Sequence, residues 1–389
     1  METPPPFPPL SFIVKVASRC NLNCSYCYVY NREDSTWKNK PAAMSDDIFH
    51  ACVDRIREYC ARSGQRAVNI VFHGGEPCLV GAERLSKWWT YAAERLGEGL
   101  RVRFTIQTNG TLLNEEWIEV FRRHEITVGI SVDGPQEVND QFRVDHAGRS
   151  SYDKTINGIV LARDAGIRLY LLCVVQPGQD GLRIHRFLMS LGVNRISYLL
   201  PDHSYEALPQ APQFYGETPC ADYLIPIFED WWRNAEVDTR IGLFWSISRL
   251  ILGGDDDSDI FGNRALQTVF VETDGGIEGL DVLRVCENGM SATGLNVMHD
   301  GFDRLRAVPL HGPSIFSKLE LPTDCRGCSE QNTCGGGYLP HRYSKQRLFD
   351  NRSIWCADIL HLFGHIRGRL GVSPEGTAKR RELLVSVEK

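Results

Sequence analysis

Residues 11–27 read SFIVKVASRCNLNCSYC, an apolar run that passes directly into three closely spaced cysteines. The run at 11–16 has the β-branched composition of a strand. Cys20, Cys24 and Cys27 follow it with the spacing C-x3-C-x2-C. Thiols at such short intervals require a loop that wraps tightly around whatever it binds. We therefore expect the first strand to end in a metal-binding loop.

Five further β-rich segments recur at intervals of roughly thirty residues, with helical patterns between them. They lie at 67–72, 102–107, 127–132, 169–175 and 195–200. Strands that alternate with helices are parallel and joined by right-handed crossovers. These segments therefore form either a β/α barrel or an open doubly wound sheet, and the pattern alone does not separate the two.

The first helical pattern begins at Ser45, a residue type that caps helix N-termini. Asp46 and Asp47 follow at the positive end of the helix dipole. Four residues recur at every fourth position and are expected to share a buried face: Ile48, Cys52, Ile56 and Cys60.

Polar, glycine-rich clusters follow the strands instead of preceding them. The second strand leads into HGGEP at 73–77, the third into QTNG at 107–110 and the fourth into VDGP at 132–135. Loops at the carboxyl ends of parallel strands build the active site of β/α folds. The cysteine loop and these three loops should therefore converge on one site.

Three thiolates make an incomplete shell for zinc, which normally recruits a fourth Cys or His. A four-iron cluster held by three cysteines instead leaves one iron open to another ligand. A second set, Cys325, Cys328 and Cys334 in C-x2-C-x5-C spacing, is followed by Cys356 and offers four thiolates. Spacing alone leaves zinc open for both sets, in a zinc-binding module without radical chemistry.

With these motifs the chain resembles the radical S-adenosylmethionine (SAM) superfamily, whose signature is C-x3-C-x-aromatic-C, with Tyr26 as the aromatic residue. The resemblance implies an α/β fold, a partial (β/α)6 barrel of TIM type, with a [4Fe-4S] cluster on Cys20, Cys24 and Cys27. It also implies that the amino and carboxylate groups of SAM chelate the open iron. Reductive cleavage of SAM would then yield a 5′-deoxyadenosyl radical.

The same resemblance assigns a set of residues to the binding of SAM. They are Tyr26, Gly74, Gly75, Glu76, Asn109, Ser131 and Arg143. The glycine-glycine-glutamate motif would receive the methionyl amino group, and glycine permits a close approach. The serine and the arginine would contact the ribose and the carboxylate. Asn109 and Gln107 are expected to line the same pocket, although an ordinary turn explains TNG nearly as well.

The region around the second cysteine set resembles the SPASM domain, a C-terminal extension with auxiliary [4Fe-4S] clusters in radical SAM enzymes that act on peptides and proteins. By that resemblance Cys325, Cys328, Cys334 and Cys356 hold one such cluster. The stretches at 334–344 and 349–359, with VETDG at 271–275, are similar to FxsB-like maturases that form three-residue cyclophanes in ribosomally made peptides.

Many SPASM domains carry two auxiliary clusters, and this sequence departs from that pattern. The position four residues after Cys334, a cysteine in the two-cluster version, is Tyr338. Cys286 matches one further ligand, but no other cysteine lies between Cys220 and Cys286. We therefore expect roughly eight irons per chain, in two clusters, with Cys286 as a packing residue or an unliganded relic.

Two acids are candidate proton acceptors. Glu287 resembles the catalytic acid of sulfatase-maturing relatives, and Asp281 lies just upstream in LDVLR. A solvated surface acid explains each of them equally well, because the sequence shows neither burial nor a partner. Packing is the expected role of the remaining cysteines: Cys52, Cys60, Cys78, Cys173 and Cys220.

The expected parts of the chain are a radical SAM core at 1–215, a helical bridging region at 216–268, a SPASM-like domain at 269–370 and a mobile tail at 371–389. Lys and Arg total 43 against 49 for Asp and Glu, and neither sign gathers into a run that would follow a phosphate backbone. No signal peptide and no apolar stretch of membrane-spanning length is present, so we expect a cytoplasmic protein without nucleic-acid or membrane partners.

The function implied by the resemblance is radical modification of a ribosomally made precursor peptide. Hydrogen abstraction from a side-chain β-carbon would join that carbon to an aromatic ring and form a cyclophane. Formylglycine-type oxidation, thioether formation and epimerisation are alternatives on the same fold. Besides the peptide, we expect an electron donor such as flavodoxin or ferredoxin. Only about ten residues precede the first strand, so we expect leader recognition to involve another surface of the chain or a separate leader-peptide-binding protein.

Overall fold

The computed structural model describes residues 10–97, 99–207, 216–234, 238–256, 259–262, 264–317 and 319–387, with side chains to residue 382. The chain divides into two compact units. The first comprises Met1–Val132, Gln136–Leu171 and Gln267–Ser317, and the second Asp133–Pro135, Leu172–Leu266 and Lys318–Lys389. The expected boundaries at 215, 268 and 370 stay predictions. In the described chain no helix is both long and apolar enough to cross a membrane.

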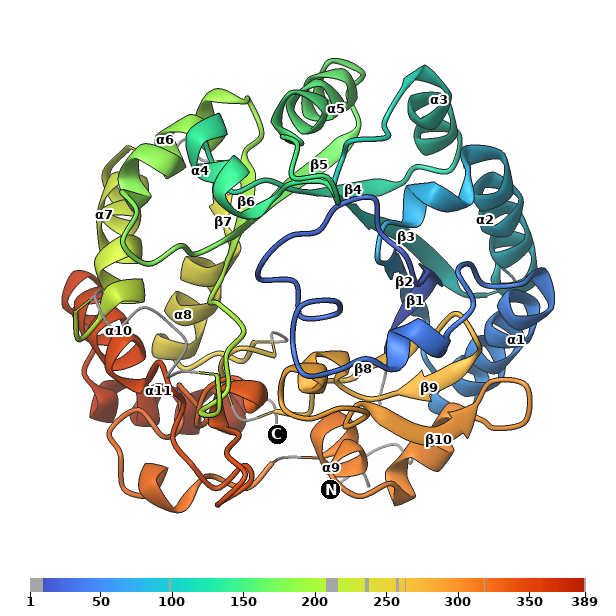
Figure 1. The fold of residues 1–389 in the computed structure, drawn as a ribbon. Helices are drawn as coiled ribbons and strands as arrows, with labels where there is room; N and C mark the ends of the chain where they lie inside the picture. The colour runs from blue at the N-terminus through green and yellow to red at the C-terminus, as the bar shows by residue number, and fades with distance from the viewer. Residues whose placement is uncertain are drawn as a thin grey trace. The chain divides into compact units, whose positions relative to one another are not determined.

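The first unit is built on four parallel strands that follow one another along the chain (Figure 1). They are β1 (Ser11–Ala17), β2 (Ala67–Gly74), β3 (Arg101–Thr108) and β4 (Thr127–Ser131). Each pairs in parallel with the next, which confirms the predicted strands and their direction. Lys15 of β1 lies opposite His73 of β2. Their side chains therefore project from the same face of the sheet.

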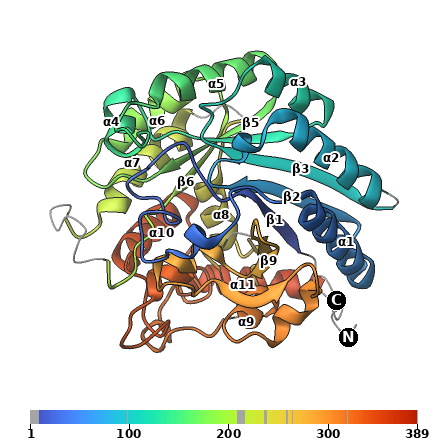
Figure 2. The same cartoon turned by 45° about the vertical axis from the view of Figure 1, so that its right-hand side comes forward.

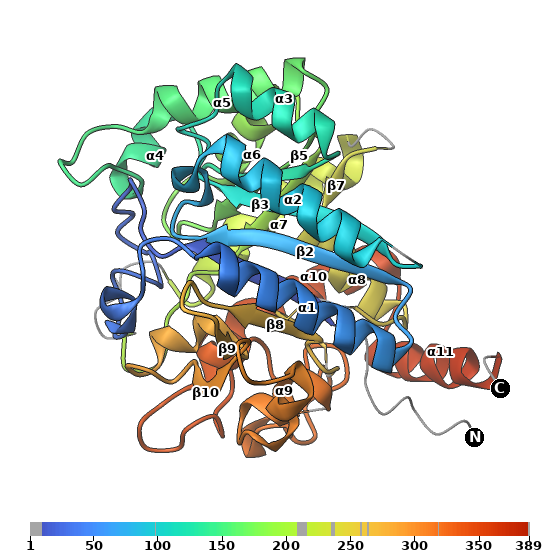
Figure 3. The same cartoon turned by 90° about the vertical axis from the view of Figure 1, so that its right-hand side faces the viewer.

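Helices cover the other face of this sheet. They are α1 (Asp46–Ser63), α2 (Ala82–Leu96), α3 (Glu115–Arg123) and α5 (Tyr152–Asp164), and the short helix α4 (Gln136–Phe142) lies between β4 and α5 in the chain. Figure 3 shows α1 and α2 alongside β2. The centroid of the Phe72 ring of β2 lies 5.8 Å from the ring centroid of Phe49 in α1 and 5.2 Å from that of Trp89 in α2. Buried aromatic contacts of this kind form the core between helices and sheet.

Helix α1 begins as predicted, because the Ser45 hydroxyl accepts a hydrogen bond from the Ile48 amide at 3.3 Å. Cys52, Ile56 and Cys60 are buried, as expected from their spacing. The prediction is wrong for Ile48, which is only half-buried, whereas Phe49 is buried. Successive helical residues are about 100° apart, and the large Phe49 ring centres the apolar face on its own position.

A second group of strands completes the first unit: β8 (Thr268–Val271), β9 (Gly276–Glu278) and β10 (Ala292–Asn296). Strand β8 pairs in parallel with β1, while β9 and β10 form an antiparallel extension. Figure 2 shows β9 with α9 (His311–Phe316) below β1. The sequence predicted short strands from about Val269. It did not predict that one of them joins the sheet of the first strand.

The second unit contains the remaining helices and strands. The boundary between the two units falls after Leu171, within β5 (Arg168–Val174). Its strands β6 (Arg195–Leu199) and β7 (Arg240–Ile241) are parallel. Its helices are α6 (Gly181–Ser190), α7 (Pro219–Asn234), α8 (Gly242–Ile251), α10 (Cys356–Leu370) and α11 (Pro374–Val387). The region at 216–268, expected to be helical, contains α7 and α8 with β7 between them, and α11 lies in the segment expected to be a tail.

A network of charged side chains is buried in the first unit. Lys15 lies 2.7 Å from both Glu272 and Asp281, and the Arg284 side chain is only 1% exposed. Arg284 contacts three carboxylates at 2.8–2.9 Å: Asp34, Glu272 and Glu278. Four acids thus surround two cations, and one acid is better accommodated in its neutral form. Burial and the Glu272 carboxylate raise the pKa of Glu278 to about 7.

We predict that this network makes stability fall as pH rises. The pKa of Glu278 is about 7 in the folded chain and 4.5 in the unfolded chain, so the folded chain holds this proton more tightly. The resulting contribution to the free energy of unfolding is fully present below pH 4.5 and is lost as the pH rises through 7. Glu278→Gln should remove the loss, which is on the order of 1–3 kcal/mol. Thermal unfolding of both proteins from pH 5 to 8 measures it. Parallel pH dependences for the two would contradict the prediction.

Candidate functional site

The loop that carries the first three cysteines lies beyond the carboxyl end of β1, where it is dark blue in Figures 1 and 3. The turn after β2 holds this loop by backbone hydrogen bonds. The Gly75 amide donates to the Ala17 carbonyl at 2.8 Å, and the Glu76 amide donates to the Arg19 carbonyl at 2.9 Å. A Cβ atom on Gly74 would overlap Ala17, and one on Gly75 would overlap the Arg19 carbonyl. Both glycines therefore permit a backbone contact with the cysteine loop.

The thiols in this loop are suited to a cationic partner. Burial, and next the nearby Glu76 carboxylate, raise the pKa of Cys20 to about 12, and burial raises the pKa of Cys27 to about 11. Thiolates in such surroundings need a metal to compensate their charge. Three thiols on one loop offer one thiolate to each of three irons and leave the fourth iron open, so the loop fits a four-iron cluster.

The Glu76 carboxylate, predicted to receive an amino group, is buried and accepts three hydrogen bonds from the protein. Its donors are the Cys78 amide at 2.9 Å, the Thr108 hydroxyl at 2.7 Å and the Asn109 amide at 2.7 Å. Burial raises the pKa of Glu76 against the opposing effect of these bonds. The carboxylate thus ties the end of β2 to the end of β3. Its direct contact with a ligand stays a prediction.

The side chain of Asn109 reaches the first cysteine. Its Nδ2 donates to Asn21 Oδ1 at 2.8 Å and lies 3.8 Å from the Cys20 sulfur. On the neighbouring strands Gln107 donates to the Ser131 hydroxyl at 3.0 Å and accepts from Tyr170 at 3.0 Å. The end of the third strand therefore presents an amide at the cysteine loop, as predicted, and the third, fourth and fifth strands are joined by amide and hydroxyl contacts.

Arg143 follows α4 and is buried, although a surface position was equally open from the sequence. Its guanidinium donates to the Tyr26 hydroxyl at 2.8 Å. The aromatic residue of the cysteine motif is thus tied to the predicted carboxylate ligand. The joint action of Arg143 and Ser131 on one ligand stays a prediction.

The two candidate proton acceptors differ in their surroundings. Glu287 is exposed. Asp281, in a 3-10 helix at Asp281–Val285, is only 3% exposed. Its carboxylate accepts from the Tyr28 hydroxyl at 2.8 Å and from Lys15 at 2.7 Å. Because Tyr28 directly follows Cys27, Asp281 is connected to the cysteine loop.

Tyr28 and Lys15 were not singled out from the sequence. One signal was available for Lys15, a lone charge within an otherwise apolar strand. Burial opposes the charge of Lys15, but the Asp281 and Glu272 carboxylates outweigh it and raise the pKa of Lys15. No short-range pattern connects Tyr28 or Lys15 with Asp281, which is more than 250 residues away in the chain.

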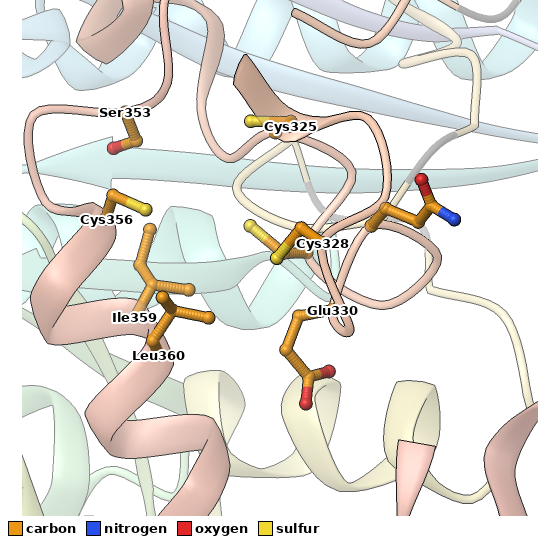
Figure 4. A pocket seen from close by; sticks show the side chains of 10 residues that line it. Cys325, Cys328, Glu330, Ser353, Cys356, Ile359 and Leu360 are labelled. Carbon is orange, nitrogen blue, oxygen red and sulfur yellow. The ribbon is translucent and has the colours of Figure 1, made fainter. Parts of the chain in front are cut away.

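The second cysteine set lines a small pocket within the second unit, shown in Figure 4. All four predicted ligands line it: Cys325, Cys328, Cys334 and Cys356. Ile359 and Leu360 of α10 form an apolar part of the wall. Burial raises the pKa of Cys334 to about 12. Four thiols around one partly apolar pocket fit a four-iron cluster and again require a cation for the thiolate form.

All thirteen cysteines of the chain are reduced. The expectation of burial is confirmed for six of them: Cys52, Cys60, Cys78, Cys173, Cys220 and Cys286. The seven predicted metal ligands are all half-buried instead. The six cysteines assigned to packing are thus buried, whereas the seven predicted metal ligands are partly accessible at the two sites.

We predict that Gly75→Ala weakens the first metal site. The added Cβ would displace the Arg19 carbonyl, and the purified protein should lose up to about four irons per chain. Gly364→Ala is the matched control, because Gly364 lies on exposed helical surface with no atom within 4 Å of a new Cβ. Iron and sulfide analysis measures the effect. A full iron complement in Gly75→Ala would show that the close approach is dispensable.

Comparison with known proteins agrees with this geometry. The model of the Radical SAM superfamily matches residues 14–189. The cysteine-type anaerobic sulfatase-maturating enzyme of Clostridium perfringens (strain 13 / Type A) is 23% identical over 370 residues, which cover 93% of this chain and 98% of that protein. The serine-type enzyme of Klebsiella aerogenes is 26% identical over 342 residues, 86% of this chain and 80% of that protein.

Solved structures share the fold. Native anSMEcpe with bound AdoMet and Cp18Cys peptide matches with a TM-score of 0.78 at 22% identity, over 93% of this chain and 98% of that one. Streptococcus suis SuiB bound to precursor peptide SuiA matches with a TM-score of 0.61 at 16% identity, over 90% of this chain and 76% of that one. These matches confirm the predicted partial barrel with its C-terminal extension.

The cysteine loop at the end of β1, the glycine turn that holds it and the match at 14–189 identify the chemistry. The cofactors are SAM and a [4Fe-4S] cluster. Residues 14–189 of this chain carry a radical SAM domain, and the chain is similar over most of its length to the anaerobic sulfatase-maturating enzymes.

Proposed function

We propose that this enzyme modifies a ribosomally made precursor peptide by joining a side-chain β-carbon to an aromatic ring. The observation that carries the proposal is the pairing of two cysteine sites, a three-thiol loop at the barrel strands and a four-thiol pocket in the second unit. A three-thiol cluster leaves one iron for SAM, and a four-thiol cluster suits electron transfer. Relatives whose names describe sulfatase maturation, and SuiB bound to its precursor peptide, support a peptide or protein substrate.

The bound cofactors would supply a radical that removes one hydrogen atom from the peptide, and an acceptor for one electron. The proposed crosslink removes two hydrogen atoms from the peptide in total. One leaves with deoxyadenosine, and the other leaves as a proton and an electron when the ring regains its aromaticity. The chain must therefore provide a proton acceptor beside the first site.

Asp281 is our proposed proton acceptor. It is buried, lies within hydrogen-bond distance of Tyr28 and is connected through Tyr28 to the cysteine loop. Lys15 would hold the carboxylate in place through its 2.7 Å contact. Glu287, in contrast, is exposed. Tyr26, Glu76, Asn109, Ser131 and Arg143, with the two glycines of the turn, are proposed to bind SAM at the strand ends.

Formylglycine-type oxidation of a Cys or Ser side chain is the second candidate function. The similarity to sulfatase-maturating enzymes over 93% of the chain favours it. It needs the same abstraction of a β-hydrogen and the same loss of a proton and an electron. An electron donor for the first cluster, such as flavodoxin or ferredoxin, and a leader-peptide-binding protein are proposed partners in either case.

We predict that Cys20→Ala, Cys24→Ala and Cys27→Ala, combined in one protein, abolish reductive SAM cleavage. The protein should stay folded and keep about four of roughly eight irons, because the second site is untouched. Deoxyadenosine, measured after anaerobic incubation with SAM and dithionite, is the readout. Wild-type amounts of deoxyadenosine in the triple variant would exclude the first site as the origin of the radical.

We predict that the modified peptide is lighter by two hydrogens and contains a bond between an aromatic ring carbon and a nearby β-carbon. Deuterium at that β-carbon should appear in deoxyadenosine, because this carbon donates the abstracted hydrogen. Mass spectrometry of both products measures the transfer. An aldehyde in the product would support the formylglycine reaction instead, and a link through sulfur would support thioether formation.

A further inference from the structure

Glu330 lies in the loop between Cys328 and Cys334 and is only 5% exposed. Its main-chain carbonyl accepts a hydrogen bond from the Cys334 amide at 2.8 Å. Its carboxylate accepts two hydrogen bonds from Arg367, from Nε at 2.6 Å and from a terminal nitrogen at 2.8 Å. Figure 4 shows the Glu330 side chain directed away from the labelled cysteines. A buried fork of this kind fixes the loop that carries three of the four thiols.

Arg367 belongs to α10, the helix that begins with the fourth cysteine, Cys356. The other terminal nitrogen of Arg367 donates to the Val372 carbonyl at 3.1 Å and to the Thr377 hydroxyl at 2.8 Å. Thr377 in turn donates to the Ile251 carbonyl at 2.6 Å. The ion pair therefore connects the loop of three cysteines to the helix of the fourth.

Burial of an ion pair is not in itself stabilising, because the cost of removing both charges from water offsets their attraction. The position of this pair gives it another role. A four-iron cluster with four thiolates carries net negative charge, and its reduction potential depends on nearby charges. An unpaired carboxylate beside the pocket would oppose reduction, whereas the Arg367 guanidinium would favour it. When the two are paired, their opposite effects on the reduction potential of the cluster nearly cancel.

We propose that Glu330 and Arg367 are positioning residues for the auxiliary cluster, which hold its four ligands in place and set its reduction potential through the balance of their charges. This inference rests on the proposed cluster in the four-cysteine pocket. It does not depend on which bond the enzyme forms in its peptide.

The test uses the variant in which Cys20, Cys24 and Cys27 are alanine, so that only the second cluster contributes. Adding Glu330→Gln keeps the shape of the side chain but leaves the guanidinium unpaired. Because Arg stays protonated, the midpoint potential should shift upward in an electron-paramagnetic-resonance titration. Adding Arg367→Met to Glu330→Gln should return the potential toward its starting value.

Glu229→Gln is the matched control. Glu229 of α7 also accepts hydrogen bonds from an arginine of α10, Arg369, with Nε at 2.6 Å. This pair is partly exposed, with Arg369 at 39% of its side-chain area, so solvent screens it. The potential should stay unchanged in Glu229→Gln.

Arg367→Lys tests the positioning role separately. It keeps the charge but loses the fork, so the cluster should keep its potential and release iron to a chelator several-fold faster. Circular dichroism establishes that each variant is folded. Loss of iron from a folded Glu330→Gln protein would support the same positioning role.

The outcomes separate this inference from the function on which it rests. A folded triple-alanine protein without iron would refute the auxiliary cluster itself. A different result would refute only the role of the ion pair. In that case the triple-alanine protein keeps its cluster, and adding Glu330→Gln or Arg367→Lys changes neither the midpoint potential nor the rate of iron release.

Discussion

The backbone contact between the glycine turn after β2 and the loop after β1 is the constraint on which the first site depends. Gly75 and Glu76 donate main-chain hydrogen bonds to Ala17 and Arg19, the residues that lead into Cys20. Side chains at the two glycines would force these backbones apart. The three thiols therefore occupy a loop whose course is set by the parallel pairing of β1 with β2. The metal ligands are thus placed by the sheet, and the following strand ends can be positioned around them.

The buried charge network extends this arrangement on the other side of β1. Lys15 projects from the sheet face opposite the helices, and its partners Glu272 and Asp281 come from the segment that includes β8 and the 3-10 helix. Because β8 pairs with β1, Glu272 and Asp281, which follow β8 closely in the chain, lie beside Lys15. Such a network costs desolvation energy and is retained where it fixes a specific geometry. Here it fixes Asp281 against Tyr28, the residue next to the last ligand of the loop.

The sequence predicted the features that depend on short-range pattern. All six strands of the barrel were found, because apolar runs and the clusters behind them recur along the chain. The cysteine spacings predicted both groups of thiols, whose metal ligation stays a prediction. Features set by distant partners were not found. The pairing of β8 with β1, the contacts of Lys15 and the hydrogen bonds of the Glu76 carboxylate join segments that no periodicity connects. The error at Ile48 has a local cause, since a four-residue spacing does not decide which neighbouring position is the centre of a buried face.

The two cysteine sites are supported by different physical means, and this difference fits different tasks. Strand ends and a glycine turn hold the first loop, and the Asn109 side chain lies beside its first cysteine. The second site has four ligands, an apolar wall from α10 and a buried arginine–glutamate fork behind its loop. A four-iron cluster held there by all four thiolates, as proposed, would leave no iron open for substrate chemistry. A closed, rigid site of this kind suits the storage and passage of single electrons, whereas bond cleavage needs the open one.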